Sequence, residues 1–376
     1  MLLKQNSGLN EPSVRKIENC TLHEIDHVEF YVADAYETAS FYKSFLGFNI
    51  IAYANKETGL KDKISYIVEQ GSIRFIFSSC SNTESSLYKH VIARDSGVKS
   101  IAFLSSNIEI DFNKSIKYGA ERALELSQVE SQDLKMKMAS VTCFGDTIHT
   151  FIQREKNKKW GMPFYKPFQD NKSEPNVGLL EIDHIAVALE KGQLNAWKGF
   201  YQNALNFQQT HREDVYTEYG GMNSLVMSNP KGTIKFPLVE PATGTRKSQI
   251  DSYLESYGCA GVQHIAFLSK DIIQTVQTLK NNGIEFLTIP NSYYDNVYQN
   301  LPSSYKQKLP ILKDLGILID TDQKGVLMQI FSKPLQNRPT FFIEIIQRDN
   351  IQGFGSNNIK ALFEAIERDQ PAINIV

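Results

Sequence analysis

The sequence predicts an α+β fold in which four βαβββ units form two similar domains. The first observation is an internal repeat, because apolar strings of the first half return in the second half with changed polar letters. The pairs are GVKSIAFLS (97–105) and GVQHIAFLS (261–269), EIDHVEFYVAD (24–34) and EIDHIAVALEK (181–191), FYKSFLGF (41–48) and FYQNALNF (200–207), and IHTFIQR (148–154) and FIEIIQR (342–348). The second observation is that each copy shows strand and helix patterns in the same order. The third is length, since 376 residues can form two domains.

Each element follows from its local pattern. IDHVEFYV alternates apolar and polar residues well enough for a strand. The helical segment after it is expected to end at Gly47, because glycine favours the left-handed conformation of helix ends. The runs KISYIVEQGSIRFIFSS and NSLVMSNPKGTIKFPLVEP then predict strands joined by tight turns. A second unit starts at each IAFLS strand, and in the second half its helix, within IIQTVQTLKNNGIEF, is closed by Gly283.

The domain division follows from a segment without periodicity. NKKWGMPFYKPFQDNKSEPNV is rich in proline, lysine and asparagine, which is typical of a linker. We therefore expect an N-terminal arm at 1–21, a first domain at 22–156, a linker at 157–178 and a second domain at 179–376. The first 20 residues are too polar for a signal peptide.

Composition excludes several classes of function. The formal net charge of −2 gives no basic surface for nucleic acid, and no apolar run is long enough to cross a membrane. The four cysteines are scattered and form no CxxC pair, so a disulfide framework or a cysteine zinc site is not expected. Free thiols are typical of the reducing cytoplasm, where we expect this protein.

The polar letters that change between the copies point to a metal site. The second half has His184, His264 and Glu344 where the first half has His27, Ser100 and Thr150. Two histidines and one carboxylate that leave coordination positions open are typical of non-haem Fe(II) oxygenases. Neighbouring strands can hold such a set, because every second residue points to the same face.

Each of these three residues also has a purely structural interpretation, which competes with metal binding. A single histidine in an apolar strand is more often a core residue than a ligand. Glu344, inside FFIEIIQR, is costly to bury without a partner. The first half evidently folds without the complete set, so packing does not require it. We therefore expect one Fe(II) per chain, bound by His184, His264 and Glu344, and no metal in the first half.

The second half resembles the 4-hydroxyphenylpyruvate dioxygenase family of the vicinal-oxygen-chelate superfamily. The matching strings are IDHIAV, SQIDSYLESYGCAGVQHIAF, LMQIFSKPLQNRPTFFIEIIQR and GFGSNNIKALFEAIERDQ. They cover most of residues 180–370, and the first half matches more weakly. The resemblance implies two such domains, with an open β-barrel around the metal in the second, and the same three iron ligands. It also implies a homo-oligomer, either a dimer or a tetramer.

The resemblance implies that an aryl-pyruvate and O2 are the substrates, with no need for 2-oxoglutarate. Ile359 and Val239 stand where homogentisate-forming members usually have phenylalanine and asparagine, which is similar to the members that make 4-hydroxymandelate. We therefore expect benzylic hydroxylation of 4-hydroxyphenylpyruvate to 4-hydroxymandelate. Homogentisate is the alternative, because Pro237, Gln336, Arg338 and Pro339 are similar to the homogentisate formers.

Further pocket residues are implied by the same resemblance. Catalytic roles fall to Gln249, Gln263, Gln329 and Asn358, and substrate contacts to Ser224, Val239, Phe331, Phe354 and Ile359. The alternative for the polar residues is that they are ordinary strand or helix-cap residues. The alternative for the phenylalanines is plain core packing. Gln263 is expected on the strand face opposite to His264. The amphipathic helix Asn358–Arg368 is expected to close the site as a lid.

Two other classes remain as rivals. An extradiol catechol dioxygenase would use the same three ligands, although the C-terminal strings argue against it. A binding module of this fold without catalysis would lack a complete ligand set, as the first half does.

Overall fold

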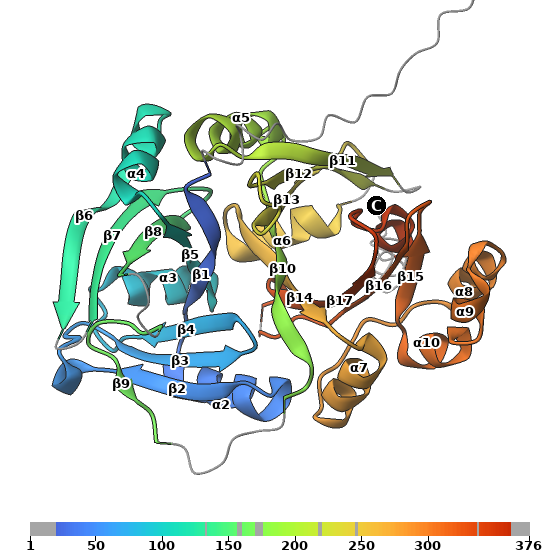
Figure 1. Ribbon diagram of the computed structural model, residues 1–376, viewed down its shortest axis with the longest axis horizontal. Helices are drawn as coiled ribbons and strands as arrows, with labels where there is room; N and C mark the ends of the chain where they lie inside the picture. The colour runs from blue at the N-terminus through green and yellow to red at the C-terminus, as the bar shows by residue number, and fades with distance from the viewer. Residues whose placement is uncertain are drawn as a thin grey trace, which may run out of the picture.

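The computed structural model describes residues 20–131, 134–155, 160–169, 176–216, 220–244, 247–336 and 338–361. The strands form two curled sheets that lie beside each other (Figure 1). In spatial order the nine-stranded sheet contains β6 (Arg122–Ser131), β7 (Leu134–Thr142), β8 (Ile148–Arg154), β5 (Gly97–Ser105), β1 (Leu22–Tyr31), β4 (Ile73–Ser79), β3 (Ile64–Gln70), β2 (Asn49–Ala54) and β9 (Lys166–Pro167). The eight-stranded sheet contains β11 (Gln208–Tyr216), β12 (Gly221–Ser228), β13 (Lys235–Pro241), β10 (Leu179–Ala188), β14 (Gly261–Ser269), β17 (Phe342–Asp349), β16 (Val326–Phe331) and β15 (Leu318–Thr321).

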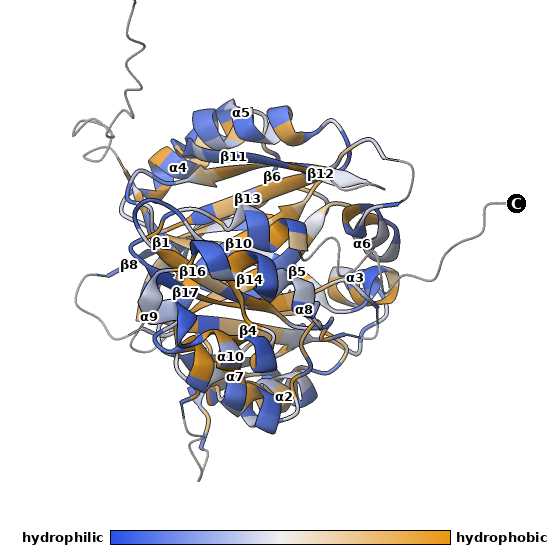
Figure 2. Cartoon of the chain, turned by 90° about the vertical axis from the view of Figure 1, so that its right-hand side faces the viewer, coloured by the Kyte–Doolittle hydropathy of each residue, from blue (hydrophilic) through white to orange (hydrophobic). Residues whose placement is uncertain are grey.

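The predicted α+β class and the repeated βαβββ order are confirmed. Each sheet is centred on an antiparallel pair, β1 with β5 and β10 with β14, and each of these strands also pairs in parallel with the last strand of its own unit. The helices are α2 (Ala35–Leu46), α3 (Ser86–Arg94), α4 (Ile108–Lys117), α5 (Leu194–Leu205), α6 (Gln249–Tyr257) and α7 (Ile272–Asn281). Figure 2 shows hydrophilic residues on the outer faces of helices and hydrophobic residues in the strands between them. Among the described residues, no helix is long and apolar enough to cross a membrane.

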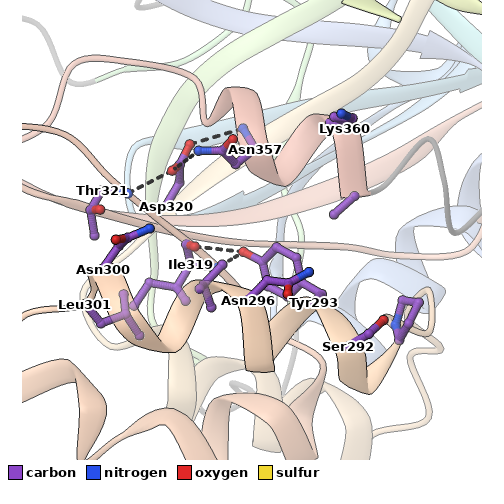
Figure 3. A pocket seen from close by; sticks show the side chains of 13 residues that line it. Ser292, Tyr293, Asn296, Asn300, Leu301, Ile319, Asp320, Thr321, Asn357 and Lys360 are labelled. Carbon is purple, nitrogen blue, oxygen red and sulfur yellow. Dashed lines mark hydrogen bonds between the residues drawn. The ribbon is translucent and has the colours of Figure 1, made fainter. Parts of the chain in front are cut away.

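The second copy differs from the first by an insertion between α7 and β15. It holds α8 (Asn291–Val297), the 3-10 turn η2 (Tyr298–Asn300), α9 (Ser303–Lys306) and α10 (Leu309–Leu315). Side chains of α8 face β15 and the helical residues 356–361 across a cavity of about 480 Å³ (Figure 3). The insertion therefore lies against the open edge of the second barrel.

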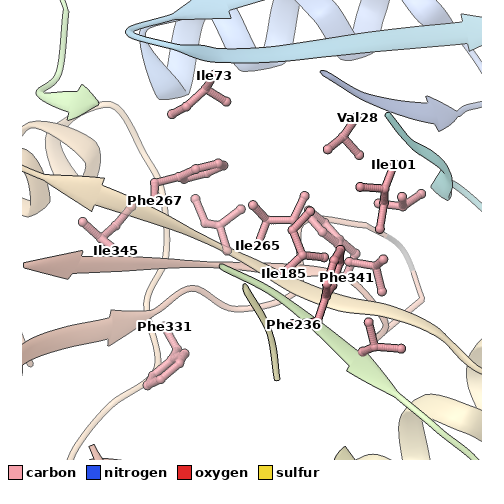
Figure 4. Close-up of a cluster of buried hydrophobic side chains, with 14 of the residues drawn as sticks. Val28, Ile73, Ile101, Ile185, Phe236, Ile265, Phe267, Phe331, Phe341 and Ile345 are labelled. Atoms are coloured by element: carbon pink, nitrogen blue, oxygen red, sulfur yellow. The ribbon is translucent and has the colours of Figure 1, made fainter. Parts of the chain in front are cut away.

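One hydrophobic core joins the two sheets. Phe267 of the second sheet packs on Phe75 of the first, with 5.9 Å between ring centroids, and Phe236 packs on Phe103 at 6.0 Å. Figure 4 shows side chains from both sheets meeting in this core. Because side chains alternate along a strand, the residues between these core positions point to the interior of their own barrel.

Three irregularities interrupt the pairing of β10 with β14, and two of them lie beside the predicted ligands. On β10 the pairing steps from Ile182 to His184, so that Asp183 has no partner in the register, and on β14 Gln263 is skipped in the same way. Such β-bulges redirect the side chains beside them. Gln263 consequently lines the same cavity as His264, and the expectation that it lies on the opposite face is wrong.

The expected linker at 157–178 is in part a structured piece of the first half. β9 pairs with β2, and the Trp160 indole N–H donates to Asp26 at 3.2 Å. Most of the predicted N-terminal arm lies outside the described residues, and so does the predicted lid helix beyond residue 361. The domain limits stay predictions.

Candidate metal centre

Three neighbouring strands of the second sheet hold the three predicted ligands. His184 lies on β10, His264 on β14 and Glu344 on β17. In the strand register His184 and Glu344 both lie beside Ala266 of the central strand. The adjacent residues Ile185, Ile265 and Ile345 are fully buried in the core between the sheets. The three ligand side chains therefore share the interior face of the barrel.

The three side chains converge on one point. The Nε2 atoms of His184 and His264 lie 3.2 and 3.4 Å from Oε2 of Glu344. One ligand atom from each residue can be chosen so that all lie within 4.8 Å of one another. His184 and Glu344 are buried, and His264 is nearly so. Two imidazoles and a carboxylate arranged in this way fit a divalent transition metal such as Fe(II).

His184 is oriented by the residue before it. Its Nδ1 lies 2.8 Å from Oδ2 of Asp183. Asp183 in turn accepts two hydrogen bonds from the Arg348 guanidinium, both 2.8 Å, and one from Lys235 at 3.2 Å. Since Nδ1 faces an anion, the proton of a neutral imidazole is held there, and Nε2 keeps its lone pair for a metal.

Glu344 is oriented by an amide. Nε2 of Gln329, on β16, donates to Oε1 of Glu344 at 2.8 Å and to the carbonyl of Phe354 at 3.2 Å. Asn358 donates from Nδ2 to Oε1 of Gln329, again at 2.8 Å. Oε1 of Glu344 is thus occupied by the amide, while Oε2 faces the histidines.

The electrostatics of the site follow from burial and these contacts. Burial alone would raise the pKa of Glu344, but the two histidines lower it to about 2. Burial likewise opposes the charge on His184, yet the carboxylates of Glu344 and Asp183 raise its pKa. Burial lowers the pKa of His264, although Glu344 opposes the shift. Asp183 has a pKa well below its usual range, because its hydrogen bonds to His184 and Arg348 outweigh burial.

A small cavity of about 60 Å³ opens beside the three ligands. It brings together nearly all the residues predicted for the pocket: Ser224, Val239, Gln249, Gln263, Gln329, Phe331, Phe354 and Ile359. Asn358 does not line it and reaches the site only through Gln329. Val239 and Ile359 belong to one apolar cluster on its wall.

Sequence reasoning missed several residues of the site. Phe342 stacks on the His264 ring, with 4.8 Å between centroids, and Glu213 lines the cavity. Asp183 and Arg348 were also missed, although a signal existed. In both copies an aspartate precedes the histidine of the first strand, and an arginine follows the Ile-Gln pair of the last strand. In the first half these residues are Asp26 and Arg154. Those two residues form the same ion pair in the first half.

The first half keeps this support and one histidine, His27, but lacks the other two ligand residues. His27 Nδ1 lies 2.7 Å from Asp26, as in the second half. Ser100 and Thr150, at the positions of His264 and Glu344, hydrogen-bond to each other at 2.7 Å. Among the described residues, the group formed by His184, His264 and Glu344 is the one that could hold a metal ion.

Comparisons with known proteins agree with this geometry. Residues 181–330 match the family model of the Glyoxalase/Bleomycin resistance protein/Dioxygenase superfamily. The chain is 38% identical over 360 residues to the 4-hydroxyphenylpyruvate dioxygenase of Yarrowia lipolytica, covering 92% of this chain and 91% of that protein. It is 40% identical over 358 residues to the enzyme of that name from Xenopus tropicalis, with the same coverage. The solved structure of a mutant 4-hydroxymandelate synthase from Streptomyces coelicolor matches with a TM-score of 0.84 and 30% identity, covering 93% of this chain and all of that chain.

Proposed function

The chain belongs to the 4-hydroxyphenylpyruvate dioxygenase family, and we propose that it oxidatively decarboxylates 4-hydroxyphenylpyruvate with O2 and hydroxylates the benzylic carbon. The products would be 4-hydroxymandelate and CO2, an equation that balances without a further oxidant. The observation that supports this proposal most strongly is the convergence of two histidines and one glutamate beside the cavity.

His184, His264 and Glu344 would hold one Fe(II). Iron bound there supplies the redox chemistry by which O2 reacts with a 2-oxo acid that loses CO2. The protein's own contribution is orientation. Asp183 directs Nε2 of His184 inward, and Gln329 directs one oxygen of Glu344 toward the histidines.

The cavity would hold the substrate in a dry, shaped space. Phe331 and Phe354 present rings next to the ligands. The ring centroids lie 5.2 Å apart for Phe354 and His184, and 6.1 Å apart for Phe331 and His264. Such rings favour offset or edge contacts with an aromatic substrate. The amides of Gln249 and Gln263 and the Ser224 hydroxyl are the neutral polar groups that would orient its carboxylate, keto and phenol oxygens.

The product depends on how the ring lies. Ile359 and Val239 form a joint apolar stretch of the cavity wall. A branched aliphatic side chain gives the ring less flat support than phenylalanine, and valine offers no amide to the phenol. We propose that the ring tilts away from the metal, so that the benzylic carbon lies nearer, and a displacement of about 1 Å can change such rates strongly.

A second candidate is hydroxylation of the ring to homogentisate. The names of the curated relatives favour it, since the proteins from Yarrowia and Xenopus are both 4-hydroxyphenylpyruvate dioxygenases. The two candidates share the metal site and the substrate, and they differ only in which carbon is hydroxylated.

The reaction class has a simple test. Iron-loaded protein should consume O2 when 4-hydroxyphenylpyruvate is the sole organic substrate, with release of CO2. A strict requirement for added 2-oxoglutarate would contradict the proposal, because the substrate would then not serve as the 2-oxo acid. Assembly as a dimer or tetramer and a cytoplasmic location stay predictions.

A further inference from the structure

A chain of buried hydrogen bonds runs from the inserted segment to the metal ligand Glu344. It starts at Tyr293 of α8, whose hydroxyl accepts from the Ile319 N–H at 2.9 Å and lies 2.5 Å from Oδ1 of Asn358. It continues through Asn358 and Gln329 to Glu344. All four side chains are at least 90% buried.

The direction of each hydrogen bond is dictated by its neighbour. An ionised Glu344 can only accept, so Gln329 must present its amide nitrogen and keep its oxygen for Asn358. Asn358 must then present its own nitrogen, and its oxygen needs a donor. The donor is the Tyr293 hydroxyl, which lies nearer to Asn358 than to its other acceptor, the Ile319 carbonyl at 2.7 Å.

This chain is a feature of the second half. The position of Gln329, opposite Ile346 in the sheet, corresponds to Met138 opposite Ile152 in the first half. The insertion that carries Tyr293 also stands only in the second copy. Figure 3 shows Tyr293 beside Ile319 of β15 and below the helical turn that carries Asn357, and all three residues line the larger cavity.

We infer that Tyr293 is a positioning residue, which fixes the orientation of the Glu344 carboxylate through Asn358 and Gln329. Without its hydroxyl the Asn358 oxygen loses its donor, both amides gain alternative orientations, and Glu344 is held less firmly. The inference rests on the proposal that Glu344 binds the metal. It assigns the inserted segment a role in the metal site, beyond covering the barrel edge.

The neighbouring residue provides a matched control. Tyr294 lies on the same helix and is also buried, but its hydroxyl has no hydrogen-bond partner within the part of the chain that the structure describes. Tyr293→Phe and Tyr294→Phe therefore remove the same atom from the same helix. Only the first removes a link of the chain.

The test is Co(II) binding to the metal-free full-length protein, measured by competition with a chelator and by the visible absorption of bound Co(II). Tyr293→Phe should weaken binding about 3- to 10-fold and shift the absorption, somewhat less than the roughly 10- to 100-fold typical of a direct partner of a ligand. Tyr294→Phe should leave both unchanged. In a Gln329→Met background, where the chain is already cut, Tyr293→Phe should have no further effect.

Equal binding by the two phenylalanine variants would overturn the inference, and so would additive effects of Tyr293→Phe and Gln329→Met. If Tyr293→Phe does not fold, Asn358→Leu cuts the next link and should behave in the same way toward Co(II). Wild-type protein and His264→Ala, measured alongside, separate a failure of the proposed metal site from a failure of the proposed role of Tyr293. If these two bind Co(II) equally, the metal site itself is refuted rather than the role of Tyr293.

Discussion

Gln329 of β16 reaches diagonally to Glu344 of the neighbouring strand β17, with 2.8 Å between the amide Nε2 and the carboxylate Oε1. In the first half Met138 and Thr150 take these positions, and no carboxylate is present there to be oriented. The two halves thus share strands, bulges and the Asp–His–Arg contacts, and they differ at the positions of His264 and Glu344 and at the groups that orient Glu344. This difference makes the first half an internal control for experiments on the second.

The first prediction concerns the ligands. His184→Ala, His264→Ala and Glu344→Ala should each abolish turnover and weaken binding of Fe(II) by orders of magnitude, because each removes one of three donors. His27→Ala should keep both turnover and iron, since its neighbours offer no further ligands. Iron content after purification and oxygen uptake measure the two effects. Loss of iron in His27→Ala with retention in His264→Ala would contradict the assignment.

The second prediction concerns Asp183. Asp183→Asn removes the charge that holds His184 Nδ1 and should weaken metal binding about 10- to 100-fold. Asp26→Asn makes the same change in the first half and should leave metal binding unaltered. Both variants leave a buried arginine without its anion, so both should lower the free energy of unfolding, by roughly 3 kcal/mol. Metal affinity and urea unfolding, measured in parallel, separate the role of Asp183 in metal binding from its role in stability. Equal metal affinities of the two variants would contradict the role in metal binding.

The third prediction is the pH dependence of metal binding. The raised pKa of His184 lies above the ordinary value of 6.5, so in metal-free protein a proton begins to compete with the metal from above that pH. Glu344, with a pKa of about 2, stays ionised throughout the range and does not contribute. Affinity for Co(II) should therefore fall steadily from pH 8 to pH 5.5. An affinity that is constant or rises on acidification would be inconsistent with histidine ligation.

The fourth prediction concerns acid stability. His149 is fully buried on β8, its Nε2 lies 2.8 Å from the Tyr201 hydroxyl of the second half, and burial lowers its pKa to about 3. The unfolded chain, with a pKa near 6.5, binds the proton first. Stability should fall on acidification from 6.5 toward 3, by at most about 1.4 kcal/mol per pH unit. Urea unfolding of His149→Phe should show a shallower pH slope than wild type, and an equal slope would exclude His149 as the cause.

The fifth prediction concerns product choice. Ile359→Phe combined with Val239→Asn should raise the share of homogentisate, because the ring gains a flat support and the phenol an amide partner. A change of about 1.4 kcal/mol in relative barriers shifts the ratio tenfold. Chromatography of the products measures the ratio. An unchanged ratio in an active double variant would show that these residues do not direct the reaction.

Much of the fold could be predicted from the sequence, because the apolar residues of the first half recur at matching positions in the second half. The alternation of IDHIAV places Ile185 in the core and His184 on the other face. The polar residues that differ between the copies, His264 and Glu344, together with His184 predict the metal ligands. Both conclusions depend on local periodicity and on comparison of the two copies. Neither requires knowledge of long-range contacts.

The remaining features depend on tertiary structure. The bulge that brings Gln263 to the face of His264 arises from pairing with β10, and no local sequence pattern predicts it. The approach of Tyr293 to Asn358 joins an insertion without counterpart in the first half to the C-terminal region, so the repeat could not reveal it. Phe342 resembles an ordinary strand residue until its ring is seen on His264.

The most direct measurement is the product of the wild-type protein. Iron-loaded protein is incubated with 4-hydroxyphenylpyruvate and O2, and the products are separated by chromatography and identified by NMR, since 4-hydroxymandelate and homogentisate have the same mass. We predict 4-hydroxymandelate as the main product, formed together with CO2. Homogentisate as nearly the sole product would contradict the proposed role of Ile359 and Val239, and failure to consume O2 would contradict the proposed function as a whole.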